Sequence, residues 1–179
     1  WRNLFAAALW TGMRKGELCG LLKADVDLEG RTLTVARSYD NPSTKGLHAD
    51  VLPIADPLMP YLKDAIDRSP SKWVFPAADG SMRVGTSKPE KILRSALARA
   101  GLFDGWEHCC RRCKAKGKPH VERHSDGELR RCPDCYMKLW PRAVKRRMRF
   151  HDLRHYATAT LLLRAGVDAH RVQRILRHA

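Results

Sequence analysis

The pattern of hydrophobic and polar positions predicts a mainly helical protein that contains one small antiparallel β-sheet. Residues 31–37 alternate and are rich in β-branched side chains, which is typical of a strand, and residues 48–54 are expected to return beside them. A polar loop over residues 38–46 would join the two strands as a hairpin. Helices are expected from apolar stripes at helical spacing over residues 4–10, 14–22, 56–66, 87–100, 151–165 and 168–176.

Several helix ends carry recognisable signals. Gly12 follows the first apolar run and is expected to end that helix. Ser87 and Glu90 have the spacing of a capping box, and Asp168 is expected to cap the last helix. The helix over residues 151–165 is expected to be largely buried.

Length and composition limit the class of protein. The 179 residues are 44% hydrophobic, which excludes global disorder and allows one domain plus an appendage. The longest apolar runs are too short to span a bilayer, and no secretory signal precedes them. The formal net charge of +15 suggests a polyanionic partner, for which nucleic acid and an anionic membrane face are the usual candidates. The opening at Trp1, without a start Met, is interpreted as that of a fragment.

The basic residues and the cysteines concentrate in one segment. Residues 106–149 hold 14 of the 34 Lys and Arg residues and five of the six cysteines. Cys19 lies outside the segment, in an apolar context that predicts a buried thiol. Trp106 and Trp140 flank the segment and are expected to seat its base on the rest of the protein.

Two C-x2-C pairs within this segment predict a structural zinc site. The four ligands would be Cys110, Cys113, Cys132 and Cys135, with 18 residues between the pairs. Two disulfides are the rival interpretation, although nothing in the sequence suggests secretion. Four spare residues offer a substitute ligand, namely Cys109, His108, His120 and His124. We interpret residues 103–148 as a zinc ribbon inserted into a host domain formed by residues 1–102 and 149–179.

Four separated motifs in the host domain carry candidate chemistry. Thr11 to Leu18 reads T-G-M-R-K-G-E-L, Lys45 lies in the hairpin loop, residues 151–155 read H-D-L-R-H, and residues 176–179 read L-R-H-A. In this order they resemble the catalytic domain of the tyrosine recombinases, the phage integrase family, with Arg177 in place of the usual Gly of the third box. The cysteine segment is foreign to the common family pattern.

The residue types suit cleavage of a phosphodiester by a side-chain hydroxyl. The transition state carries extra negative charge on its non-bridging oxygens, and a guanidinium offers a charged planar fork to two such oxygens. The resemblance assigns this clamp to Arg14 and Arg154. Glu17, one turn after Arg14, is expected to orient its guanidinium.

The resemblance also assigns the proton transfers. Lys45 would protonate the departing 5′-oxygen, and His151 would take or return the proton of the nucleophile. His178 would donate to a phosphate oxygen. His155, next to Arg154 in the sequence, is expected to face another direction than Arg154, in a structural role or as a phosphate contact. Tyr156 is expected to have a packing role on the buried helix.

None of the four tyrosines of the chain fits the nucleophile of the family, which is therefore expected downstream of Ala179. The resemblance implies cleavage and rejoining of double-stranded DNA through a 3′-phosphotyrosine, by a tetramer, with no catalytic metal or nucleotide cofactor. A cytoplasmic, nucleoid-associated protein of a bacterium or phage is expected, with no membrane role. The fragment alone is expected to be inactive. A tyrosine-type topoisomerase and a non-enzymatic DNA-binding module on a degenerate scaffold remain open alternatives.

The inserted ribbon has two open interpretations. Its positive charge suggests that it extends the DNA footprint through phosphate contacts, which would steepen the salt dependence of affinity. The alternative is a structural or protein-binding knob with a solvated basic face.

Overall fold

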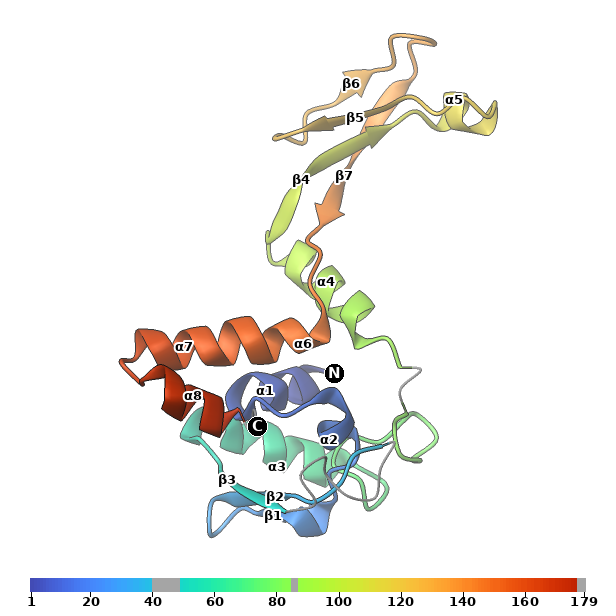
Figure 1. The fold of residues 1–179 in the computed structure, drawn as a ribbon. Coiled ribbons are helices and arrows are strands. Elements are labelled where there is room, and N and C mark those ends of the chain that lie inside the picture. The colour runs from blue at the N-terminus through green and yellow to red at the C-terminus, as the bar shows by residue number, and fades with distance from the viewer. Residues whose placement is uncertain (40–48, 85–86, 177–179) are drawn as a thin grey trace. The chain divides into compact units, whose positions relative to one another are not determined.

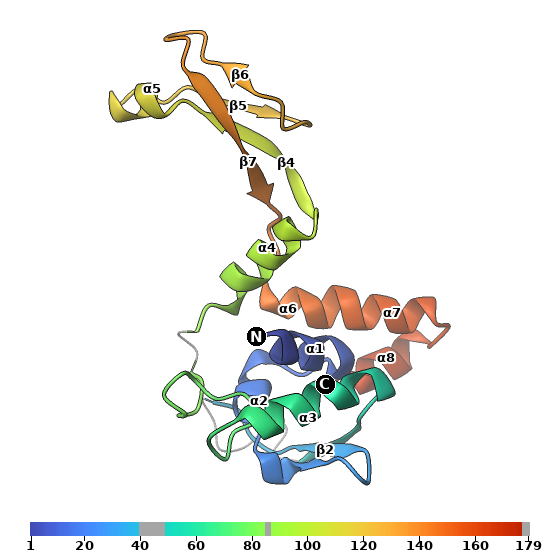
Figure 2. The same ribbon diagram turned by 180° about the vertical axis from the view of Figure 1, so that it is seen from behind.

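A computed structural model describes residues 1–39, 49–84 and 87–176, with the side chains at positions 156 and 157 left aside. The chain divides into two compact units (Figures 1 and 2). Unit 1 comprises Trp1–Pro89 and Arg149–Ala179, and unit 2 comprises Glu90–Met148. The helix α4 (Pro89–Arg99) belongs by its contacts to unit 2, whereas the sequence analysis placed it in the host domain. The limits of the domains expected from the sequence stay a prediction.

Unit 1 is built mainly of helices around α1. In chain order its elements are α1 (Arg2–Thr11), α2 (Lys15–Cys19), η1 (Lys23–Asp25), β1 (Val26–Asp27), β2 (Thr32–Val35), β3 (Asp50–Pro53), η2 (Asp56–Leu58), α3 (Met59–Arg68), α6 (Phe150–Asp152), η3 (Leu153–Thr158), α7 (Ala159–Arg164) and α8 (Ala169–Ile175). α1 packs against α3 on one side and against η3 on the other. Its buried side chains, Leu4, Ala7 and Ala8, therefore lie at the centre of the unit.

The sheet of unit 1 has three antiparallel strands in the order β1-β2-β3. β2 is central, and Leu33 and Val35 point into the core because alternate residues of a strand face one side. β1 is not among the strands expected from the sequence. It pairs through Val26 with Leu33, and its two residues are too few to show an alternating pattern.

Helix ends follow the sequence signals closely. Gly12 ends α1 in the left-handed conformation, and the Asp168 side chain accepts a hydrogen bond from the Arg171 N–H at 3.0 Å at the start of α8. The prediction of a largely buried helix over 151–165 is wrong for α7, where Leu161 is 51% and Leu163 is 50% exposed. α1 covers η3, so burial is concentrated there rather than along the whole segment.

Unit 2 holds α4 (Pro89–Arg99), β4 (Phe103–Cys109), α5 (Arg111–Ala115), β5 (Val121–His124), β6 (Arg130–Arg131) and β7 (Lys138–Lys145). Its sheet has the antiparallel order β5-β4-β7-β6. The helices and the small sheet of unit 1, together with a separate cysteine-bearing unit, confirm the predicted fold class. Among the described residues, no helix has both the length and the apolar character needed to cross a membrane.

Candidate active site and metal site

Arg14 stands at the start of α2 and is held by a buried carboxylate. Its backbone N–H donates to Glu17 Oε2 at 2.8 Å, and its Nη1 lies 2.9 Å from Glu17 Oε1. Glu17 is 4% exposed, whereas the side chain of Arg14 is 35% exposed. The carboxylate therefore orients the guanidinium from the interior side and leaves part of it open to solvent.

Arg154 lies in η3, a π-helical segment, and is 1% exposed. Its Nη1 donates to the carbonyl oxygen of Gly12. Gly12 adopts φ 61°, and this left-handed turn links the end of α1 to the start of α2. Arg154 is therefore bonded directly to the turn that leads into Arg14, although the two arginines are far apart in the sequence.

Gly12 is required both by its backbone and by its neighbours. A Cβ at this position would lie 2.8 Å from Cδ2 of Leu176 and 3.3 Å from Cγ2 of Thr158. Gly166 shares the left-handed conformation, at φ 82°, but a Cβ added there would meet nothing within 4 Å. Substitutions at the two glycines therefore distinguish the cost of backbone strain alone from the cost of strain combined with steric overlap.

We expect Gly12→Ala to destabilise unit 1 by about 1–3 kcal/mol or more, since strain and overlap combine. Gly166→Ala should cost only the strain, on the order of 1 kcal/mol. Urea unfolding of the two variants measures the difference. Equal losses would show that the contact of Gly12 with Leu176 and Thr158 does not constrain the turn.

The rings of His151 and His155 pack edge to face. Their centroids are 4.2 Å apart with the planes at 75°. The ring of His155 lies against His151 because residues four apart lie on the same side of a helix. The i, i+4 spacing of the two histidines in the sequence is the signal from which this contact could have been predicted. The expectation that His155 faces another direction than the adjacent Arg154 stays a prediction.

Burial lowers the pKa of His151, and the positive charges of His155, Arg154, Arg149 and Arg14 lower it further. Arg14 and Arg154 thus act electrostatically on the same imidazole. Because the charged form is disfavoured, His151 is neutral at pH 7 and can accept a proton.

A titration followed by NMR should find the pKa of His151 below the ordinary value of about 6.5. His155→Ala should raise that pKa, since it removes a neighbouring cation, and Arg149→Gln should raise it less. An unchanged or lower pKa in His155→Ala would contradict the assigned cause.

Lys45 and His178 lie outside the described residues, and so does the side chain of Tyr156. The structure describes the chain before the hairpin loop as far as Tyr39. The Tyr39 N–H donates to the Gly16 carbonyl at 3.1 Å, and a Cβ on Gly16 would overlap Oγ of Ser38. The chain that leads to the hairpin loop therefore runs directly against α2.

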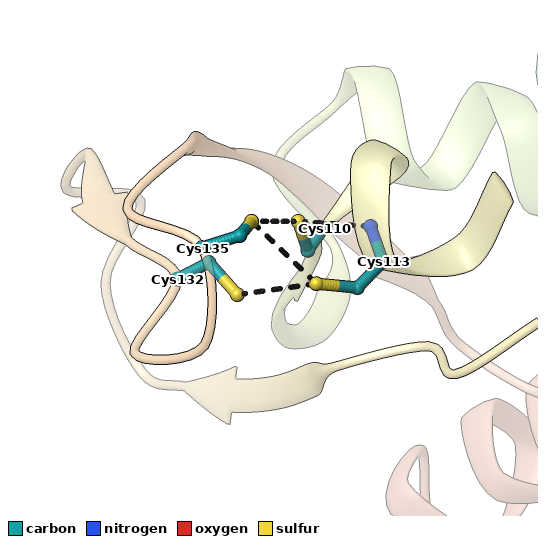
Figure 3. Close-up of side chains that lie close together, drawn as sticks. All are labelled: Cys110, Cys113, Cys132 and Cys135. Atoms are coloured by element: carbon teal, nitrogen blue, oxygen red, sulfur yellow. Dashed lines mark hydrogen bonds between the residues drawn. The ribbon is translucent and has the colours of Figure 1, made fainter. Parts of the chain in front are cut away.

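The four cysteines predicted as ligands come together in unit 2 (Figure 3). Sγ of Cys110 lies 3.4 Å from Sγ of Cys135, and Sγ of Cys113 lies 3.5 Å from Cys135 and 3.7 Å from Cys132. All six cysteines of the chain are free thiols. A disulfide needs about 2.0 Å, whereas sulfurs held about 2.3 Å from a tetrahedral zinc lie about 3.8 Å apart. The spacing fits a metal site and not the rival disulfides.

Local structure shifts the pKa values of the thiols in opposite directions. The hydrogen bond with Cys135 raises the pKa of Cys113, and burial raises that of Cys132. Cys110 caps α5, and the Cys113 N–H donates to its Sγ at 3.4 Å. This hydrogen bond favours the thiolate and lowers the pKa of Cys110 to about 7. His120, one of the spare residues, offers a ring nitrogen within 4.8 Å of Cys132 and Asp134. Cys19 is a buried thiol as expected, and burial raises its pKa to about 11.

Comparison with known proteins identifies the class. The family model described as the phage integrase family matches residues 1–128, so the chain belongs to the phage integrase family. The matched range includes Arg14 and Glu17 and ends before His151. No curated protein sequence matches the chain.

Solved structures share the fold. The Tn1549 transposon integrase, described in complex with a circular intermediate DNA, is 16% identical with a TM-score of 0.64, and the match covers 98% of this chain and 50% of that one. XerA recombinase is 23% identical with a TM-score of 0.60, covering 99% and 52%. A λ integrase tetramer bound to a Holliday junction is 18% identical with a TM-score of 0.53, covering 99% and 40%. The chain thus spans about half of the length of these structures.

Proposed function

We propose that the intact protein is a tyrosine site-specific recombinase that cleaves and rejoins double-stranded DNA through a 3′-phosphotyrosine. The observation that carries this proposal is the bond from Arg154 to the Gly12 carbonyl, in the turn that leads to Arg14. Two guanidiniums from distant segments thereby approach one site in a chain that belongs to the phage integrase family.

Each residue has a distinct role in the proposal. Arg14 and Arg154 neutralise the non-bridging oxygens of the scissile phosphate, and Glu17 keeps Arg14 in position. Because Arg154 is 1% exposed, the surface above it must open when DNA binds. His151, neutral at pH 7, accepts the proton of the nucleophile.

The remaining roles rest on the resemblance of the motifs. Lys45 protonates the leaving 5′-oxygen, and His178 donates to a phosphate oxygen. The nucleophilic tyrosine comes from sequence outside these 179 residues. The covalent link conserves the bond energy, so the chemistry requires neither a nucleotide cofactor nor a catalytic metal.

In unit 2, Cys110, Cys113, Cys132 and Cys135 hold a structural zinc ion. Their sulfur–sulfur distances of 3.4–3.7 Å and the burial of Cys110, Cys113 and Cys132 support this assignment. The ion would supply folding energy that the few buried side chains of unit 2 do not.

The active protein assembles as a tetramer on two DNA duplexes; λ integrase, a structural neighbour, is described as a tetramer bound to a Holliday junction. A cavity of about 740 Å³ beside the edge strand β3, lined also by residues of α7 and α8, can receive a chain segment from a neighbouring copy. Such an enzyme acts on bacterial or phage DNA and therefore works in the cytoplasm.

A nicked suicide duplex tests the proposed reaction with a version of the protein that extends past Ala179. The expected result is a covalent protein–DNA adduct at the 3′-phosphate, trapped because the nicked strand diffuses away. Binding without an adduct would favour the non-enzymatic DNA-binding module. Relaxation of one supercoiled duplex, without exchange between two, would favour the topoisomerase.

A further inference from the structure

The sheet of unit 2 has one covered face and one open face. His108 of β4 and Leu139 of β7 are both 0% exposed, so one face of the sheet points inward. Their neighbours Cys109 and Trp140 are directly opposite each other and must point outward, because alternate residues of a strand face opposite sides. We call this second side the outer face.

The strand register defines the members of the outer face. Cys109 pairs with Val121 on β5 and with Trp140 on β7, which gives one row across the sheet. Glu107 pairs with Arg123 and Arg142 in the next row. Directly opposed residues project to the same side, so both rows belong to one continuous surface.

The outer face is strongly basic. Arg123 and Arg142 flank Glu107, the acidic member of these two rows, and Lys138 continues the face along β7. Arg111 and Lys114 of α5 border the same surface. The five basic side chains of this region belong to exposed residues, so a polyanion can reach them.

Trp140 lies among these basic side chains on the outer face and is 55% exposed. The expectation that it seats the ribbon on the rest of the protein is therefore wrong. Trp106 packs edge-on against Phe103 at 5.0 Å and lies against Gly127, and both of these contacts are within unit 2. Val121, in the same row of the outer face, is 48% exposed, so Trp140 is part of a wider exposed apolar strip, which is a feature of ligand-binding surfaces.

A hollow lies beside the indole. It has a volume of about 390 Å³ and is lined by Glu107, Cys109, Arg111, Lys114, Trp140, Pro141 and Arg142. An aromatic wall combined with guanidinium and ammonium groups offers a base a stacking partner and its phosphates ionic contacts. Bases within an intact duplex are already stacked on one another, so only an unpaired base can use the wall.

We infer that the outer face binds single-stranded DNA, with a base stacked on Trp140 and the adjacent phosphates on Arg111, Lys114 and Arg142. The choice of DNA over RNA rests on the proposed function. The surface would hold an unpaired strand on the same protein chain that carries out strand exchange. It adds to the recombinase a contact that does not depend on the scissile phosphate.

Binding of a fluorescein-labelled twelve-nucleotide oligo-dT to the 179-residue chain, followed by fluorescence anisotropy at about 0.15 M salt, tests this inference. Trp140→Ala should weaken binding by about tenfold or more, and Trp140→Phe should retain most of the affinity because it keeps an aromatic face. Trp1→Ala removes a comparably exposed tryptophan from unit 1 and should leave the affinity unchanged. Arg142→Ala and Lys114→Ala should each reduce the salt slope by about 0.7.

Zinc content and thermal unfolding establish that each variant is folded. Oligo-dT affinity that is unchanged in a folded Trp140→Ala variant would overturn the inference, and so would wild-type binding to duplex DNA alone. Either result would leave the recombinase proposal intact, because the suicide-duplex adduct forms on the nucleophilic tyrosine at the site of Arg14 and Arg154 and does not depend on Trp140. Absence of that adduct would overturn the recombinase proposal, but the oligo-dT measurement would still show whether the outer face binds single-stranded DNA.

Discussion

Replacing Cys113 by Ser will release the metal and unfold unit 2, while unit 1 keeps its structure. The buried cluster of unit 2 consists of Cys110, Cys113, Cys132 and Leu139, with Cys135 packed against it. Without an ion, this cluster leaves little apolar surface to stabilise the sheet. Structural zinc contributes on the order of 10–16 kcal/mol of binding free energy in small domains, which is folding free energy when the site forms only in the folded state.

The measurement combines metal analysis with limited proteolysis. Wild-type protein should contain one zinc ion per chain and resist cleavage within residues 90–148. Cys113→Ser, or wild type treated with a strong chelator, should be cleaved there, while the buried α1 of unit 1 stays protected. Cys109→Ser is the matched control, since Cys109 lies on the outer face and outside the four-thiol group. A metal-free Cys113→Ser protein with an intact unit 2 would contradict the structural role.

Substituting either arginine of the candidate site will abolish nearly all strand cleavage. Arg14→Ala and Arg154→Lys should each slow formation of the covalent adduct by about 10²–10⁴-fold, because each removes a donor aimed at charge that develops in the transition state. Lysine keeps the charge of Arg154 but loses the planar fork that also reaches the Gly12 carbonyl. Glu17→Gln should have a smaller effect, since it removes the support of Arg14 and not the guanidinium itself.

Single-turnover assays on the suicide duplex measure these rates. Arg68→Ala provides the control, because Arg68 is an exposed residue of α3 that pairs with Asp64 on the surface. DNA affinity should change far less than the cleavage rate in the three site variants, and Arg68→Ala should leave both unchanged. Equal losses of affinity and rate would show that the arginines serve ground-state binding alone.

Local signals in the sequence were sufficient for much of unit 1. Gly12 and Asp168 marked helix ends because left-handed backbone and side-chain capping are properties of single residues. The C-x2-C pairs predicted the thiol cluster for the same reason, since each pair fixes two sulfurs locally. The order of the motifs then indicated the phage integrase family, which the family match confirms.

Other features depend on contacts that no local pattern encodes. The π-helical form of η3, which holds Arg154, is not detected by a search for regular helical stripes. The bond between Arg154 and the Gly12 carbonyl spans 142 positions. The exposure of Trp140 follows from the register of β4 and β7, which sets the side of the sheet on which the indole lies.

The central claim is that Arg14 and Arg154 act on the oxygens of one phosphodiester. A suicide duplex whose scissile phosphate is replaced by a neutral methylphosphonate tests it, because that group carries no charge for a guanidinium to neutralise. With a version of the protein that extends past Ala179, the account predicts that the cleavage defects of Arg14→Ala and Arg154→Lys shrink by at least about tenfold on this substrate. Defects that stay as large on the methylphosphonate as on the phosphate would contradict it.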